Sequence, residues 1–369
     1  MIHPGLDELQ RAYRGRRVLL TGHTGFKGGW LTLWLADLGA EVHGLAQPPS
    51  TEPSLFESAG IGEVCRHRQA DVRDLEAVRT AVREARPEVI FHLAAQPLVR
   101  LSYEEPLRTL QTNLLGTAHL LEALRLERHP AAVVLITSDK CYENVEWLHG
   151  YREGEALGGK DPYSASKAAA EVVASAWRRS FFPPARLAEH GVAVATTRAG
   201  NVVGGGDWSR DRIVPDAVRA LAAGAPIAVR NPAAVRPWQH VLEPLSGYLL
   251  LGARLRDGAD RASFCEAWNF GPRFEDARTV REVAEVAIRA WGGGSWEDRG
   301  EPGAPAEAGI LRLGIEKAQG RLGWAPRWRF EEGVTRSVAW YRAHHDGLRG
   351  EGLRALCRKQ IRDYLETAA

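Results

Sequence analysis

Short runs of aliphatic and β-branched residues alternate with helical patterns through the first 200 residues of the chain. Arg17 to Thr21 predicts a buried strand, and apolar residues at helical spacing from Trp30 to Leu38, ended by Gly39, predict a helix after it. Further strands are predicted at Glu41 to Leu45, Val89 to Leu93, Val133 to Ile136 and Val192 to Thr197. This order is typical of βαβ units, so we expect an α/β fold with a doubly wound parallel sheet.

Beyond Asn201 the alternation becomes irregular, with a Gly204-Gly205-Gly206 run, several prolines and scattered tryptophans. We expect three regions: a doubly wound domain over 1–200, a smaller substrate-binding lobe over 201–345 with segments returning to the main sheet, and a C-terminal helix within 346–369. Leu353 to Leu365 has the amphipathic pattern of that helix. Gly292 to Gly309, rich in Gly, Pro, Ala and Glu, is expected to be a surface loop.

Composition narrows the function classes. At 369 residues the chain can bury a full core, and its net charge of +2 gives no electrostatic case for nucleic acid or an anionic membrane. Met1 to Arg17 is polar and no apolar run is long enough to span a bilayer, so we expect a cytoplasmic protein. The four cysteines lie far apart without metal-ligand spacing, which predicts free thiols and no metal site.

A glycine-rich turn follows the first predicted strand and opens the first predicted helix. Glycine permits a tight turn and close approach of a diphosphate, and the helix N-terminus supplies N–H donors. An ordinary strand-to-helix turn is the alternative interpretation. The candidate dinucleotide contacts in the turn are Gly22, Thr24, Gly25, Phe26, Lys27 and Gly28.

The second predicted strand ends Leu45-Ala46-Gln47-Pro48, without the acid that usually binds the adenosine ribose. No arginine stands there for a 2′-phosphate either, which favours NAD over NADP. Asp71 and Val72 are placed to contact the adenine. The alternative role for Asp71, a helix N-cap, is better filled by Asp74.

Tyr163 and Lys167 lie four residues apart at the start of a predicted helix, so both project from one face. A lysine ammonium and a positive nicotinamide near a phenol lower its pKa, so the phenol accepts a hydroxyl proton near neutrality. Ser138, at the end of the preceding strand, can hydrogen-bond the same hydroxyl. Asp139 and Lys140 follow Ser138 and suggest further proton transfer, with a solvated ion pair as the alternative.

At these residues the chain resembles the extended short-chain dehydrogenase/reductases, and within them the CDP-glucose 4,6-dehydratases. The likeness spans nearly the whole chain from Val18 to about Tyr341. Epimerases share the glycine turn and the Tyr/Lys pair but not Ser138-Asp139-Lys140, and other sugar-nucleotide dehydratases carry Asp-Glu at the doublet. The sequence runs that carry the likeness to this family are TGHTGFKGGWL from Thr21, HLAAQPLVRLSY from His92, TSDKCYEN from Thr137, DPYSASKAAAE from Asp161, RAGNVVGGGDW from Arg198, RPWQHVLEPLSGYL from Arg236 and NFGP from Asn269.

The resemblance implies a Rossmann-type domain that holds NAD tightly and regenerates it in each turnover, with Leu93, Ala94 and Ala95 as added cofactor contacts. It implies conversion of CDP-D-glucose to CDP-4-dehydro-6-deoxy-D-glucose, a step of deoxysugar synthesis, with Asp139 as acid and Lys140 as base or its electrostatic partner. The implied substrate residues are Asn201, Arg212, Arg236 and Asn269; Arg236 is the best candidate for the diphosphate, because a guanidinium binds two phosphate oxygens at once.

Three alternatives stay open: another NDP-hexose 4,6-dehydratase, a nucleotide-sugar epimerase or reductase, and a non-catalytic NAD-binding regulator. The residues carry no readable code for the nucleotide base. Helices expected over Pro106 to Arg125 and Ser164 to Ser180 each present an apolar stripe, and related enzymes pair these helices across a two-fold axis. A homodimer, or a tetramer built from it, is therefore expected.

Overall fold

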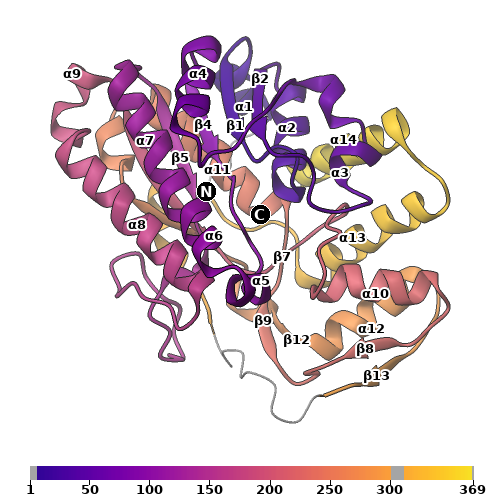
Figure 1. The fold of residues 1–369 in the computed structure, drawn as a ribbon. Helices are drawn as coiled ribbons and strands as arrows, with labels where there is room; N and C mark the ends of the chain where they lie inside the picture. The colour runs from indigo at the N-terminus through magenta and orange to yellow at the C-terminus, as the bar shows by residue number, and fades with distance from the viewer. Residues whose placement is uncertain (1–5, 301–310, 368–369) are drawn as a thin grey trace.

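The computed structural model describes residues 6–300 and 311–367. At its centre lies a seven-stranded parallel sheet of order β11-β6-β5-β4-β1-β2-β3 (Figure 1). All five strands predicted from the pattern are confirmed within a residue or two. The strands are β1 (Arg17–Thr21), β2 (Glu41–Ala46), β3 (Arg66–Gln69), β4 (Val89–His92), β5 (Ala132–Ile136), β6 (Ala193–Ala199) and β11 (Ala267–Phe270).

Two strands of this sheet were not predicted from the sequence pattern. β3 reads Arg-His-Arg-Gln and lies at the sheet edge, so it has no apolar run to mark it. β11 comes from the irregular second half of the chain and pairs in parallel with β6 at the opposite edge. The division of the chain into regions at 200 and 345 stays a prediction.

Helices cover both faces of the sheet and bury two apolar layers. α4, α7 and α8 pack together on one face, whereas α2 and α11 cover the other (Figure 1). Trp30 and Trp34 of α2 are fully buried. The helices with their bounds are α1 (Leu6–Tyr13), α2 (Phe26–Asp37), α3 (Leu55–Ser58), α4 (Leu75–Ala85), α5 (Val99–Glu104), α6 (Pro106–Leu110), α7 (Gly116–Glu127), α8 (Pro162–Ser180), α9 (Leu187–His190), α10 (Ile213–Ala222), α11 (Leu242–Asp257), α12 (Val280–Trp291), α13 (Phe330–His345) and α14 (Gly350–Glu366).

A smaller lobe lies beyond the carboxyl ends of the strands, where α10 and α12 pack beside short two-stranded sheets (Figure 1). The prediction of a surface loop over Gly292 to Gly309 is wrong in part, because the strand β13 lies within this stretch. Residues 301–309 of the stretch fall outside the described residues. The short strands are β7 (Val202–Val203) with β10 (Gln239–His240), β8 (Ile227–Val229) with β13 (Trp296–Asp298), and β9 (Val235–Pro237) with β12 (Ala277–Thr279).

Single-turn helices connect the larger elements. A π-helical segment, η2, joins α6 to α7, so the single helix predicted over Pro106 to Arg125 is one helical run with a bulge in it. These segments are η1 (Ile61–Val64), η2 (Gln111–Leu115), η3 (Asp139–Cys141), η4 (Pro184–Arg186), η5 (Arg261–Phe264), η6 (Phe274–Asp276) and η7 (Ala318–Leu322). Among the described residues, no helix has the length and apolar content needed to traverse a bilayer.

Candidate active site

The glycine turn lies between β1 and β4, where the strand order of the sheet reverses. Gly22 has φ +79°, and a Cβ there would come 2.7 Å from the Ala94 backbone nitrogen. A Cβ on Gly28 would come 2.1 Å from the Gly22 carbonyl oxygen. Gly25, the exposed N-cap of α2, has only ordinary contacts around its missing Cβ. The turn thus closes tightly on β4 and leaves the α2 N-terminus open at the switch point, which fits a dinucleotide diphosphate.

The residues predicted to contact the adenosine lie beside this turn. The Arg73 guanidinium binds Asp71 with Nε to Oδ2 at 2.8 Å, and the Gln47 amide donates to the same carboxylate. Although burial acts to raise it, these bonds hold the pKa of Asp71 below its usual value. Asp74 caps α4 by accepting from the Ala77 N–H at 3.1 Å, as predicted, so Asp71 is not the helix cap. A cavity of about 360 Å³ adjoins Asp71.

Ser138 and Asp139 stand at the carboxyl end of β5. The Ser138 hydroxyl accepts from the Lys140 N–H at 3.2 Å and donates to Asp139 Oδ1 at 3.0 Å, which caps the turn η3. Asp139 is only 3% exposed, so the alternative of a solvated ion pair is wrong for this carboxyl. Burial raises its pKa, although Lys140 and Lys27 act to lower it. A raised pKa favours the protonated form of the carboxyl, which is the form that an acid needs.

Tyr163 and Lys167 project from the first two turns of α8, and both are buried. Lys167 Nζ donates to the Ile136 carbonyl oxygen at 3.3 Å, and burial lowers its pKa to about 8. Burial raises the pKa of Tyr163 to about 12, against a hydrogen bond from Ser138 and the charge of Arg212. The expected lowering of the phenol pKa is therefore not supplied by the protein's own groups, because desolvation of the phenolate outweighs them.

Charged groups from four segments converge at the carboxyl ends of the strands. Burial lowers the pKa of Lys27 to about 8, and the charges of Arg212, Lys167, Asp139 and Asp207 all act on it. Arg212 reaches Asp207 with Nη1 to Oδ2 at 2.5 Å. The predicted cofactor lysine, the predicted catalytic acid and the predicted substrate arginine thus share one electrostatic site.

The other predicted substrate residues occupy different surroundings. The Asn201 backbone carbonyl oxygen accepts a hydrogen bond from the Gln239 N–H at 3.1 Å. Arg236 is half-buried and lies on β9, which pairs with β12. The Asn269 side chain is fully buried: its amide donates to the Tyr151 and Gly314 carbonyls, and its oxygen accepts from the Tyr142 hydroxyl at 2.8 Å. A substrate role for these residues stays a prediction.

Several residues that support the site were not singled out from the sequence. The Ser102 hydroxyl oxygen accepts a hydrogen bond from the Tyr163 N–H at 3.2 Å. Asn113, in the π-helical segment, accepts from the Gln96 N–H and donates to the Ser166 hydroxyl, both at 2.8 Å. A buried asparagine in an apolar helical run is the signal that could have found it. Among the described residues, no group of three or more His, Cys, Asp or Glu is arranged to hold a metal ion.

The parallel sheet, the glycine turn at its switch point and the Tyr163/Lys167 pair define an enzyme of the short-chain dehydrogenase/reductase class. The family model described as GDP-mannose 4,6 dehydratase matches residues 19–337, and the chain belongs to that family.

Three known proteins illustrate the likeness. The CDP-glucose 4,6-dehydratase of Salmonella typhimurium (strain LT2) is 50% identical over 354 residues, which is 96% of this chain and 97% of that protein. The UDP-glucose 4-epimerase of Thermus thermophilus in complex with NAD superposes with a TM-score of 0.72 at 27% identity, covering 88% of this chain and 99% of that one. The dTDP-glucose 4,6-dehydratase DesIV of Streptomyces venezuelae, with NAD bound, shares the fold at a TM-score of 0.74 and 24% identity, covering 91% and 99%.

Proposed function

We propose that this protein is an NAD-dependent CDP-D-glucose 4,6-dehydratase, which forms CDP-4-dehydro-6-deoxy-D-glucose and water. The observation that carries the proposal is the position of the buried Asp139 carboxyl, in the turn η3 that packs against the helix α8 of Tyr163, at the carboxyl ends of the strands. An oxidation followed by elimination needs both groups, whereas an epimerase needs no acid at C6. The 50% identity to the Salmonella enzyme supports CDP-glucose as the substrate.

The residues of the glycine turn and of the β4 end fit the cofactor, because only glycine is tolerated at Gly22 and Gly28 and the α2 N-terminus is open. Lys167 would hold the nicotinamide ribose and Asp71 the adenine. Bound there, NAD would supply the hydride acceptor for C4 and the hydride donor for C6, so the cycle would consume no cofactor. Such a cycle favours an enzyme that never releases its cofactor.

The protein's own residues move the protons. Tyr163, whose phenol lies within the influence of Ser138, is placed to take the proton of the C4 hydroxyl as the C4 carbonyl forms. The carbonyl acidifies the C5 proton, which passes to Lys140 or to a base that Lys140 assists. Asp139 gives its proton to the C6 hydroxyl, the C6–O bond breaks and water leaves, so the acid becomes a carboxylate. The base returns its proton to C5 as hydride is added at C6. The proton that Tyr163 took from the C4 hydroxyl replaces the one that Asp139 gave up, so the enzyme regains its starting state. Arg236 and Arg212 would bind the diphosphate, and Asn201 and Asn269 would line the sugar side.

The proposal is tested with CDP-, dTDP- and GDP-glucose, each incubated with the enzyme. A base-labile 4-keto-6-deoxy product from CDP-glucose supports the proposal. The same product from another NDP-glucose alone moves the assignment to that substrate, and a C4 epimer without loss of water overturns it.

As a second measurement, Asp139→Asn and Lys140→Met should accumulate enzyme-bound NADH, read from its near-ultraviolet absorbance, because both act after C4 oxidation. If neither variant forms NADH while substrate still binds, the doublet belongs to the oxidation step.

We further propose a cytoplasmic homodimer, or a tetramer built from it. Large apolar side chains stay exposed on the helices α6 to α8, which lie side by side (Figure 1). Leu107, Leu115 and Val172 are 72%, 46% and 56% exposed. A self-complementary patch of this kind closes with two-fold symmetry. Light scattering at micromolar concentration should give at least the dimer mass, and Leu107→Asp with Val172→Asp should lower it; a monomer mass for the unmodified chain contradicts the proposal.

A further inference from the structure

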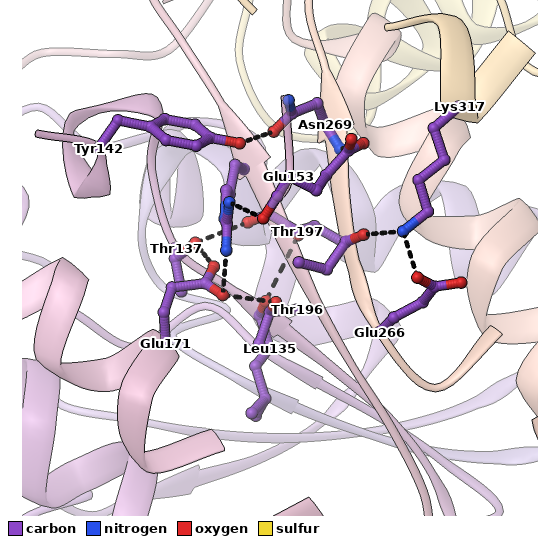
Figure 2. A network of polar contacts seen from close by, with 12 residues as sticks. Leu135, Thr137, Tyr142, Glu153, Glu171, Thr196, Thr197, Glu266, Asn269 and Lys317 are labelled. Atoms are coloured by element: carbon purple, nitrogen blue, oxygen red, sulfur yellow. Dashed lines mark hydrogen bonds and ion pairs between the residues drawn. The ribbon is translucent and has the colours of Figure 1, made fainter. Parts of the chain in front are cut away.

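Glu171 is a buried carboxylate one helical turn beyond Lys167 on α8, and only 4% of it is exposed. Its Oε1 accepts from the Thr137 hydroxyl at 2.5 Å, and its Oε2 accepts from the Thr196 hydroxyl at 2.7 Å. Figure 2 shows its carboxylate directed at both threonines. A single side chain of the catalytic helix is therefore bonded to the end of β5 and, through Thr196, to β6.

The bond to Thr137 links two catalytic segments. Thr137 immediately precedes Ser138 and Asp139, while Glu171 shares α8 with Tyr163 and Lys167. The Thr137 N–H also donates to the Thr197 carbonyl at 2.8 Å, which holds the segment against β6. The distance between the phenol and the carboxyl of Asp139 thus depends on how Thr137 is held against Glu171.

Arg198 completes the arrangement and balances its charge. Its Nη2 lies 3.0 Å from Glu171 Oε2, and both side chains are 3% exposed. Its guanidinium carbon lies 4.7 Å from the centre of the Tyr142 ring, and its Nη1 donates to the Glu153 carbonyl at 3.1 Å. Burial acts to raise the pKa of Glu171, but Arg198 and the two threonines hold it below its usual value, so the carboxylate is ionised.

We propose that the Glu171–Arg198 pair is a positioning device, which holds Ser138 and Asp139 at the separation from Tyr163 and Lys167 that lets one site carry out both oxidation and elimination. This inference rests on the proposed function. Replacement of a buried ion pair by apolar residues is often neutral for stability, so stability alone does not account for a charged pair here. Displacement of a catalytic group by 1 Å, in contrast, costs on the order of 10²-fold in rate.

The two threonines provide a matched test. Thr137→Val and Thr196→Val each remove one hydroxyl bond to Glu171 at nearly constant volume, but only Thr137 adjoins the catalytic segment. The Thr137 hydroxyl also lies 3.0 Å from the Thr197 carbonyl oxygen, to which the Thr137 N–H remains bonded in the valine variant. We expect Thr137→Val to lower kcat about 10- to 100-fold with KM for CDP-glucose nearly unchanged. Thr196→Val should keep kcat within about twofold, and Thr137→Ser should restore it, because the hydroxyl returns. Thermal melts and bound NAD establish that each variant is folded.

A stability role alone predicts a different pattern. Equal kcat for the two valine variants, or a Thr137→Ser variant as slow as Thr137→Val, would overturn the inference. Arg327→Met is a further control: it removes another buried arginine, which caps the C-terminal end of α14 through the Tyr364, Leu365 and Thr367 carbonyls. It should lower the melting temperature without changing kcat. A wild-type enzyme that dehydrates no NDP-hexose overturns the proposed function, and this inference with it, whereas wild-type turnover with unchanged valine variants overturns the inference alone.

Discussion

Gly200, directly after β6, makes room for Asp139, the proposed catalytic acid. A Cβ at this position would come 2.8 Å from Asp139 Oδ2, and no positive φ makes alanine strained there. In Gly200→Ala the carboxyl must move by about 0.6 Å to reach the 3.4 Å at which contact becomes ordinary. The obstructed atom is the end of a side chain, so the fold absorbs the change at little cost, while Asp139 leaves its position beside Ser138.

The effect on rate follows from that displacement. If 1 Å of misplacement costs about 10²-fold, then 0.6 Å corresponds to about tenfold in the elimination step, or about 1.4 kcal/mol. Stopped-flow absorbance should show NADH forming at the wild-type rate but persisting longer, because only the step after C4 oxidation is slowed. Gly154→Ala is the matched control, since nothing lies within 4 Å of its added Cβ. Wild-type decay of NADH in Gly200→Ala, with the melting temperature unchanged, would refute the placement of Asp139 as the acid.

Three further predictions concern the oxidation step, the cofactor and the pH dependence of stability. Tyr163→Phe should lower turnover about 10²- to 10⁴-fold and leave no NADH, because it removes the phenol proposed as the proton acceptor; near-wild-type turnover would exclude that role. The purified protein should carry NAD(H), measured after denaturation, and lose activity when stripped of it; activity of a fully apo preparation without added NAD contradicts the proposed cycle. Fully buried Glu243, which accepts from the Trp328 N–H at 2.7 Å and the Tyr364 hydroxyl at 2.8 Å, has its pKa raised by burial to about 7. Folded Glu243 therefore binds a proton more tightly than it does in the unfolded chain. Its contribution to the free energy of unfolding is fully present below pH 4.5 and is lost as pH rises to 7, by about 3 kcal/mol. Relative to wild type, Glu243→Gln should gain stability across that window in urea unfolding, and a difference independent of pH would contradict the assignment.

Much of the main sheet was predictable because its central strands are buried on both faces. Such strands read as continuous apolar runs, as in Val89–His92 and Ala132–Ile136, and the helices between them carry apolar residues at helical spacing. β3 was not predictable, because an edge strand of Arg-His-Arg-Gln is held by backbone bonds to β2 rather than by side-chain burial. β13 was hidden for a related reason: three residues pair with β8 inside a stretch whose composition is typical of a loop.

The sequence by itself indicated the candidate chemistry of the site, since the glycine turn and the Tyr163/Lys167 pair are local patterns whose geometry follows from one turn and one helix. Tertiary structure decided the electrostatics. The sequence predicted an acid at Asp139 and left a solvated ion pair open as the alternative. The fold buries Asp139 where Gly200, just after β6, leaves space, and that burial raises its pKa. The bond from Glu171 to Thr137 joins residues 34 positions apart. Desolvation and long-range contacts depend on which segments meet in space, and no local pattern of the chain encodes them.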